Sequence, residues 1–246
     1  SIRRWPKIRR SRPGARGREL PDTWWSSPKE PADPLGRGGR TGRMTVEEAA
    51  SACGLTLDPD RVKRLEQYLD LVLAWNRRVD LVAPGSREEI RDRHLLDSLL
   101  LLAMADPPAE REVVDIGSGA GFPGLVWAIA RPDLRVALVE PRHRRAAFLE
   151  RVLLEMRLSN ADVFARRAED LAREPLHQGR YDLATARSVG PPEEVLRLAR
   201  PLLRPGGAVF VPIGPDAPVP EGARLLVRPV PWAPGRVRRA LVFLEK

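Results

Sequence analysis

The chain has 246 residues but only one cysteine, Cys53, so no disulfide can form within it. It has no run of 18 or more apolar residues, which argues against a membrane-spanning helix. No apolar stretch follows a charged one in the manner of a secretory signal. The three histidines have no cysteine or second histidine at metal-ligand spacing. We therefore expect a cytoplasmic protein with no metal site and no membrane partner.

The formal net charge of +9 is concentrated in the first 43 residues, which hold twelve Lys and Arg against four Asp and Glu, a balance of +8. Residues 44–246 hold thirty against twenty-nine, a balance of +1. Net charge therefore does not predict a nucleic-acid surface on this larger part, where we expect most arginines to lie on solvated helix faces.

Residues 1–43 contain six prolines and six glycines without a helical or strand period, which predicts a disordered tail. Its tryptophans, Trp5, Trp24 and Trp25, leave two interpretations open. One is an RNA-binding arm, with arginines for phosphates and tryptophans for base stacking. The other, which we favour, is that the reading frame starts at Met44 and the tail is an artefact of the start site.

Residues 44–107 show helical patterns. Thr45 and the pair Asp58-Pro59 are typical of helix starts, and apolar residues at helical spacing follow the second. A third helix is expected from about 86 to 104, and Asp106-Pro107-Pro108 marks a boundary. We therefore predict an N-terminal helical cap over 44–107, followed by a second domain over 108–246.

Strand and helix patterns alternate after residue 108, which predicts a parallel sheet covered by helices on both faces. Two further strands, near 223–229 and 237–245, have no helix between them and predict an antiparallel hairpin that closes a seven-stranded sheet. The other strands are expected near 112–117, 135–140, 162–166, 181–187 and 207–212, and the helices near 121–131, 142–157, 168–174 and 191–203.

The stretch 113–121 reads Val-Val-Asp-Ile-Gly-Ser-Gly-Ala-Gly, which is a strand that runs into a glycine turn before a helix. Gly117, Gly119 and Gly121 allow the backbone to approach a ligand closely. Nicotinamide-binding proteins usually space such glycines as G-x-G-x-x-G. The closer spacing and the acidic Asp115 instead suit a cationic ligand such as S-adenosylmethionine. Glu140, at the end of the next strand, is placed to accept hydrogen bonds from ribose hydroxyls.

The turn and its continuation Phe122-Pro123-Gly124 resemble the glycine motif of the bacterial small-subunit ribosomal RNA (guanine-N7) methyltransferases, the glucose-inhibited division protein B (GidB) family. The resemblance extends over about residues 55–215. Further matching segments occur in the family's order, namely Trp75-Asn76, His94-Leu95-Leu96-Asp97-Ser98, Leu138-Val139-Glu140, Phe148-Leu149, Arg167-Ala168-Glu169 and Ala186-Arg187.

This resemblance implies a Rossmann-like class I methyltransferase that uses S-adenosylmethionine to modify guanine N7 in small-subunit ribosomal RNA. It implies that Gly117 and Phe122 border the cofactor, that Ala168 and Glu169 lie near the adenine, and that Arg187 closes the site. With the residues of the glycine turn, the predicted cofactor-binding set is Asp115, Gly117, Gly119, Phe122, Glu140, Ala168, Glu169 and Arg187.

The chain departs from the family pattern at two places that bear on the RNA substrate. Asp80-Leu81-Val82 stands where the family usually has Asn-Leu-Thr, and Ile213-Gly214 stands where it usually has Lys-Gly. The second change removes a positive charge from the expected RNA face.

The residues also favour N7 as the attacking atom. The Asn/Asp-Pro-Pro-aromatic motif that handles exocyclic amines is absent at Thr185–Ser188, and Cys53 lies outside the pocket region, which argues against carbon methylation. We predict Arg187 as the catalytic residue, which holds either the cofactor carboxylate or the guanine O6; the alternative is a surface ion pair.

His94 and Asp97 share one helix face, and for them RNA binding and docking of the cap weigh equally. Three functions stay open: the monomeric ribosomal RNA methyltransferase that we favour, a small-molecule methyltransferase on the same fold, and a non-catalytic RNA-binding or assembly protein that holds the cofactor.

Overall fold

A computed structural model describes residues 43–245, which form one seven-stranded sheet in the order β3-β2-β1-β4-β5-β7-β6. The first five strands are mutually parallel, whereas β7 pairs antiparallel with both β5 and β6. This confirms the mostly parallel sheet with a C-terminal hairpin. The strands are β1 (Glu112–Ile116), β2 (Arg135–Val139), β3 (Ala161–Phe164), β4 (Tyr181–Ala186), β5 (Leu203–Ile213), β6 (Arg224–Pro229) and β7 (Val237–Leu244).

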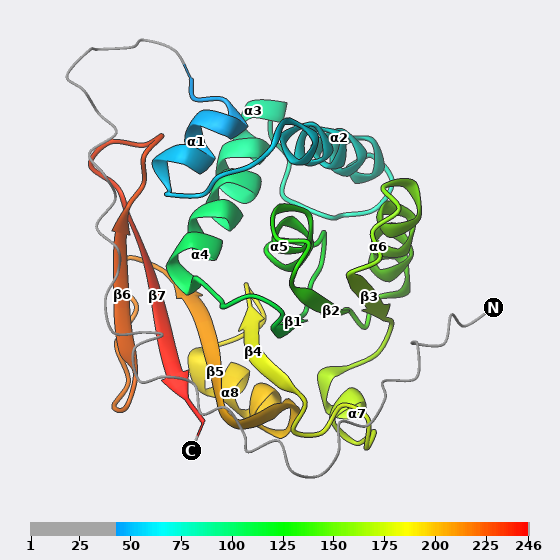
Figure 1. Cartoon of the computed structure of the whole chain (residues 1–246), viewed down its shortest axis with the longest axis vertical. Coiled ribbons are helices and arrows are strands. Elements are labelled where there is room, and N and C mark those ends of the chain that lie inside the picture. Colours follow the sequence, from blue (N-terminus) through cyan, green and yellow to red (C-terminus); the bar gives the residue numbers. More distant parts are fainter. Residues whose placement is uncertain (1–42, 246) are drawn as a thin grey trace.

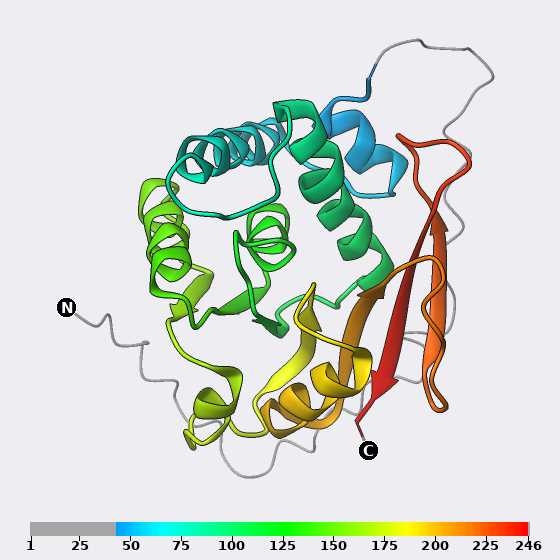
Figure 2. The ribbon, with the colours of Figure 1, turned by 180° about the vertical axis from the view of Figure 1, so that it is seen from behind.

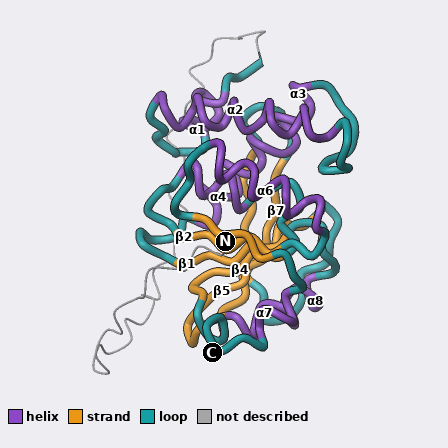
Figure 3. The backbone as a smooth tube through the Cα atoms, turned by 90° about the vertical axis from the view of Figure 1, so that its right-hand side faces the viewer, coloured by secondary structure: helices purple, strands orange, loops and turns teal. Residues whose placement is uncertain are grey.

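Helices cover both faces of the sheet (Figures 1 and 2). Seen along the sheet, the cap helices lie above the strands, and α7 and α8 lie below them (Figure 3). Successive residues of β1 divide between the two layers, since Val113 belongs to one hydrophobic cluster and Val114 to the other. The upper helices are α1 (Val46–Ala52), α2 (Pro59–Asn76), α3 (Arg87–Ile90), α4 (Asp97–Ala105), α5 (Gly124–Ala130) and α6 (His143–Glu155), and the lower ones are α7 (Ala168–Ala172) and α8 (Pro192–Ala199).

The cap shares its core with the upper layer of the sheet. Leu65 and Tyr68 of α2 belong to the same buried cluster as Trp127 of α5 and Phe148 of α6. The cap helices therefore complete the hydrophobic cover of the sheet. The division of the chain into two domains at residue 107 stays a prediction.

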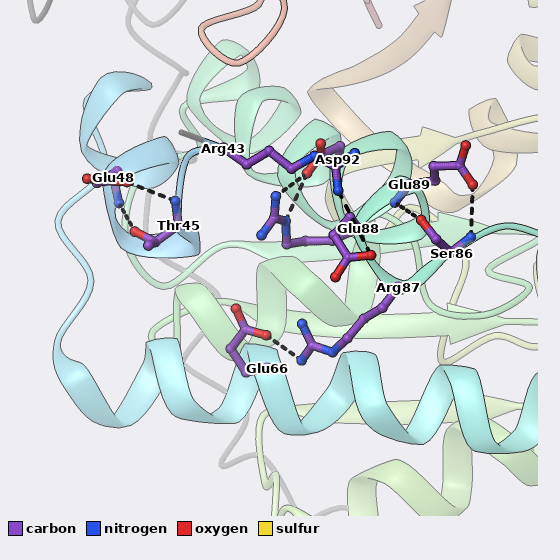
Figure 4. A network of polar contacts seen from close by, with 10 residues as sticks. Arg43, Thr45, Glu48, Glu66, Ser86, Arg87, Glu88, Glu89 and Asp92 are labelled. Carbon is purple, nitrogen blue, oxygen red and sulfur yellow. Dashed lines mark hydrogen bonds and ion pairs between the residues drawn. The ribbon is translucent and has the colours of Figure 1, made fainter. Parts of the chain in front are cut away.

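The helix starts at Thr45 and Asp58 are confirmed. Thr45 accepts a hydrogen bond from the backbone of Glu48, and Asp58 accepts one from the backbone of Arg61. Ser86 and Glu89 form a second capping box, and Arg87 pairs with Glu66 on α2, which joins two cap helices (Figure 4).

Several boundaries differ from the sequence prediction. The expected helix at 86–104 contains a π-helical segment, Arg91–Leu96, between α3 and α4. Helix α5 begins at Gly124 and not near 121, because Gly117, Gly119 and Gly121 of the preceding turn have positive φ angles, which a right-handed helix does not contain. Strand β5 begins at Leu203, where pairing with Tyr181 starts, and α8 ends at Ala199 with a short 3-10 turn after it.

Within residues 43–245, no helix is both long and apolar enough to cross a membrane. The predictions made for the tail fall outside the described residues, apart from Arg43.

Candidate functional site

Four strands end in register at one edge of the sheet. Ile116 of β1 pairs with Val139 of β2 and Ala186 of β4, and Val139 pairs with Phe164 of β3. The next residues along these strands therefore lie side by side, and they include Gly117, Glu140 and Arg187. Ligands of open α/β sheets bind outside this carboxyl edge.

The glycine turn is fastened to the end of β2. The backbone N–H groups of Gly117 and Ser118 both donate to the carbonyl of Val139, at 2.8 and 3.0 Å. Gly117 has φ +69°, and a Cβ there would lie 2.6 Å from Val189 Cγ2. Glycine is therefore required at this position for both its backbone angle and its lack of a side chain.

Asp115 supports the turn from its buried side. Its side chain is fully buried, and its Oδ2 accepts a hydrogen bond from the backbone N–H of Gly124 at 3.0 Å. A Cβ on Gly124 would lie 2.6 Å from that oxygen, which explains the glycine of the Phe-Pro-Gly segment. Burial raises the pKa of Asp115 to about 7, against the lowering effect of the Gly124 hydrogen bond. Asp115 therefore positions the turn and does not line its open side.

Glu140 joins the glycine turn to the start of α6. Its Oε2 accepts from the backbone N–H of Gly119 at 2.9 Å, and its Oε1 accepts from that of Arg142 at 2.8 Å. Each oxygen keeps a second lone pair. The carboxylate is thus oriented by the backbone and retains the capacity to accept hydroxyl groups.

Ala168 and Glu169 begin α7, shortly after β3 ends. Ala168 is buried, whereas the Glu169 carboxylate is partly exposed and lies 3.3 Å from Arg197 on α8. Their position is at the predicted edge of the sheet, on its β3 side.

His94, Asp97, Arg187 and Arg238 form what we name the carboxyl-edge cluster. Arg187 Nη1 donates to Asp97 Oδ2 at 3.3 Å, and Arg238 Nε lies 3.0 Å from Asp97 Oδ1. Burial raises the pKa of Asp97 and lowers that of Arg187, and the opposite charges counteract both effects. Because Arg187 is largely buried, its pairing is not a surface contact, and this cluster joins the cap to β4 and β7.

Phe122 lies at the centre of this arrangement. Its ring centroid is 5.2 Å from that of His94, 5.3 Å from that of Tyr68, and 5.4 Å from the guanidinium carbon of Arg187. Tyr68 also donates a 2.6 Å hydrogen bond to the Ala120 carbonyl. The turn is therefore held from above by side chains of the cap.

The contact between His94 and Arg187 determines where the imidazole carries its proton. Arg187 Nη2 lies 3.0 Å from His94 Nδ1, and because a guanidinium can only donate, Nδ1 must accept. Burial and the charge of Arg187 lower the pKa of His94 to about 4, so the ring is neutral with its proton on Nε2. That buried Nε2 atom has no hydrogen-bond partner among the described residues.

Sequence reasoning missed Tyr68, Asn76 and Arg238. Tyr68 is one of the apolar residues at helical spacing after Asp58-Pro59, and that pattern predicts its burial but not the hydrogen bond of its hydroxyl. Asn76 Oδ1 accepts from the backbone of Leu81 and Val82, which gives the Trp75-Asn76 segment a role in shaping the loop after α2. A polar atom within an otherwise apolar helical pattern is a signal for a buried hydrogen bond, and Tyr68 and Asn76 each provide one. No feature of the neighbouring sequence distinguishes Arg238 from the other arginines.

The departure at Ile213 places a buried side chain at the end of β5. Arg239 Nη1 donates to the backbone carbonyls of Gly214 at 3.2 Å and Ala217 at 3.0 Å. Positive charge is therefore present at this end of β5, from β7. Among residues 43–245, no group of His, Cys, Asp and Glu side chains is arranged to hold a metal ion.

Comparisons with known proteins agree with this geometry. A family model described as GidB, rRNA small subunit methyltransferase G, matches residues 61–216. The Ribosomal RNA small subunit methyltransferase G of Symbiobacterium thermophilum is 36% identical and covers 83% of this chain and 89% of its own length. That of Roseiflexus sp. is 43% identical over 68% of this chain and 71% of its own length.

Among solved structures, one of MtNAS in complex with MTA and tNA is similar with a TM-score of 0.51 and 15% identity. The match covers 76% of this chain and 70% of that one. It supports the fold alone.

Proposed function

This chain belongs to the GidB family, rRNA small subunit methyltransferase G, and we propose that it transfers a methyl group from S-adenosylmethionine to N7 of a guanine in small-subunit ribosomal RNA. The observation that carries the proposal is the shared carboxyl edge, where the glycine turn, Glu140 and Arg187 lie side by side. We also propose that the enzyme is a monomer and that it acts in the cytoplasm, where bacterial ribosomal RNA is found.

The residues at this edge fit the proposed cofactor. The open lone pairs of Glu140 suit ribose hydroxyls, and the buried Asp115 would provide negative charge beneath a cationic ligand. A Cβ at Gly119 would have no atom closer than 3.8 Å, so the backbone there is accessible to a ligand. We propose that Gly117 and Phe122 border the cofactor and that Ala168 and Glu169 lie near its adenine. When bound, the cofactor supplies a methyl group on a sulfonium.

Guanine N7 has a free lone pair, so the chain has no proton to remove before transfer. Its task is to align the base with the methyl group, and such alignment provides much of the rate of displacement reactions. Arg187 uses two of its five N–H donors on Asp97 and His94. We propose that its remaining donors hold the guanine O6 or the cofactor carboxylate, with Asp97 as a positioning residue.

The full chain, incubated with methyl-labelled S-adenosylmethionine, tests this function. The substrates are naked small-subunit ribosomal RNA and assembled small subunits from a strain that lacks this methylation. We expect label at N7 of a guanine, mapped by chain cleavage at the methylated base. Label in another position would refute the atom assignment, and label only in small molecules would favour a metabolite methyltransferase. Cofactor binding without transfer would favour the non-catalytic alternative.

A further inference from the structure

A groove beside the proposed active site has no role in the chemistry described so far. It has a volume of about 750 Å³ and lies between the C-terminal end of α2 and the first turns of α6, which are neighbours in Figure 1. Trp75 and Val79 contribute to its apolar surface, and three arginines lie around it, namely Arg77, Arg78 and Arg144.

Trp75 gives the groove a fixed aromatic surface. Its ring centroid lies 5.6 Å from that of the buried Phe148, which anchors the indole against α6. Trp75 and Ala147 also line a shallower neighbouring depression, so the groove extends along α6. A partly buried, anchored indole is suited to stack with a nucleobase.

The charge of the groove suits phosphate. Arg77, Arg78 and Arg144 are exposed, and none has an ion pair within residues 43–245. The acid that lines the same groove, Asp70, lies 3.1 Å from Arg87, which partly neutralises it. Glu150 lines only the neighbouring depression, on the side away from the start of α6. The part of the groove nearest the start of α6 is therefore the positive part.

The start of α6 lies next to both the groove and the glycine turn. Arg145, adjacent to Arg144, donates to the Asp80 carbonyl at 2.5 Å, and its Nη1 would lie 3.9 Å from a Cβ at Gly119. We infer that the groove binds a single-stranded RNA segment next to the target guanine, with a base on Trp75 and phosphates on the three arginines. This inference rests on the proposed function.

The test removes the charge of the groove without touching the active site. In the full chain, one variant combines Arg77→Gln, Arg78→Gln and Arg144→Gln. The matched control combines Arg135→Gln, Arg157→Gln and Arg224→Gln, which are exposed and have no ion pair in the described part of the chain. Arg135 begins β2 and Arg157 precedes β3, both toward the amino edge of the sheet, and Arg224 lies on β6, the edge strand farthest from β3 and α6. Affinity is measured by fluorescence anisotropy, over a range of salt, for a short mixed-sequence single-stranded RNA and for a small-subunit ribosomal RNA transcript. Affinity for assembled small subunits is measured in parallel.

We expect the groove variant to bind both RNAs about tenfold more weakly, with its salt dependence reduced by a slope of about 2 for three lost phosphate contacts. The control and the wild type should agree, and calorimetry should give one affinity for S-adenosylmethionine in all three proteins. Trp75→Leu should weaken RNA binding at every salt concentration with an unchanged slope.

A groove variant that behaves like its control would overturn the inference. A loss seen with assembled subunits and not with naked RNA would also overturn it, because the occupant would then be a protein. If the wild type neither binds nor methylates ribosomal RNA, the proposed function fails. If the wild type methylates RNA while both triple variants match it, only the groove assignment fails.

Discussion

Strand β4 has a buried cluster of charged side chains at each of its ends. At the first end, Asp182 Oδ2 accepts from the backbone N–H of Glu112 at 2.8 Å, and Oδ1 pairs with Arg111 and Arg204. At the last end, Arg187 pairs with Asp97 and contacts His94. Both clusters bury opposite charges, yet only the second lies where the sheet accepts ligands.

The two ends of β4 differ in the part of the fold that provides the partners of the buried charge. The carboxylate of Asp182 contacts Arg111, which directly precedes β1, Glu112 at the start of β1, and Arg204 in β5. It therefore joins strands that already pair with β4. Arg187 instead meets side chains from the cap, and the Nε2 donor of His94 has no partner in the described part of the chain. Buried donors without a hydrogen-bond partner within residues 43–245 also occur at the first end, where Arg111 Nε and Arg204 Nε lack one. Burial, ion pairing and unused donors therefore do not identify a site by themselves; position at the carboxyl edge of the sheet does.

Arg187→Gln should have the largest effect on methyl transfer. It removes the cation over Phe122, and because a misplaced substrate group costs about a hundredfold in rate, kcat/KM should fall by at least that much. Arg111→Gln, at the other end of β4, removes a comparable ion pair and should leave kcat/KM of the folded protein unchanged. Kinetics on folded protein, verified by circular dichroism, checks both; equal losses would mean that the two ends do not differ in function.

Glycine substitutions at the two edges should separate stability from binding. A Cβ on Gly124 would lie 2.6 Å from Asp115 Oδ2, and one on Gly207 would lie 2.9 Å from the Arg204 carbonyl. Each alanine variant should lose about 1–3 kcal/mol of unfolding free energy in urea, as overpacked sites do. Only Gly124→Ala should also weaken cofactor binding in calorimetry, since only that residue supports the glycine turn. Weakened binding in Gly207→Ala would contradict this separation.

Asp115→Asn should change the free energy of unfolding by a smaller amount, and the size of this change should depend on pH. The folded pKa of about 7 exceeds the unfolded value of 3.8, so wild-type stability declines as pH rises through this window. Asparagine keeps an acceptor for Gly124 without the charge. The variant should therefore gain stability relative to wild type at pH 8 and lose this gain near pH 4, in urea unfolding at both values. Its affinity for S-adenosylmethionine should fall, because the negative charge under the turn is gone.

The Asp182→Asn variant serves as the comparison at the amino edge. It removes a charge that lies between two arginines and should destabilise the protein at pH 8, which is opposite to the expected gain for Asp115→Asn. A loss of stability in both variants would contradict this prediction. It would show that hydrogen bonds and nearby charges stabilise the buried carboxylate of Asp115 to the same extent as that of Asp182.

Strand patterns within single segments of the sequence were enough to predict which candidate site residues lie at the carboxyl edge of the sheet. The glycines, Glu140 and Arg187 each follow a strand, and strand periodicity is visible in the sequence. Even the burial of Asp115 follows from that period, because alternation places it with Val113 on the α5 face while Val114 and Ile116 face the other way.

Contacts between distant segments were not predictable in this way. Asp97 and Arg187 are 90 residues apart, and Tyr68 and Ala120 are 52 apart. The sequence has 42 Lys and Arg, and no local rule selects Arg238 as the second partner of Asp97. The π-helical turn that contains His94 likewise depends on how the cap packs on the sheet, which only the assembled fold determines.

The smallest expected effect is a difference between two buried histidines, His94 and His177, in the response of their NMR signals to a ligand. Burial lowers the pKa of both His94 and His177 to about 4, below the usual 6.5, so each reduces stability as pH falls through that window. His177 Nδ1 lies 2.7 Å from the Tyr181 hydroxyl, which pairs it within the fold. In ¹⁵N spectra of the histidines, His94 should show the Nε2–H tautomer, and S-adenosylmethionine or RNA should shift its signals while those of His177 stay in place. An Nδ1–H tautomer at His94 would contradict the geometry, and equal shifts at both rings would remove the distinction between a paired imidazole and one that is free to bind.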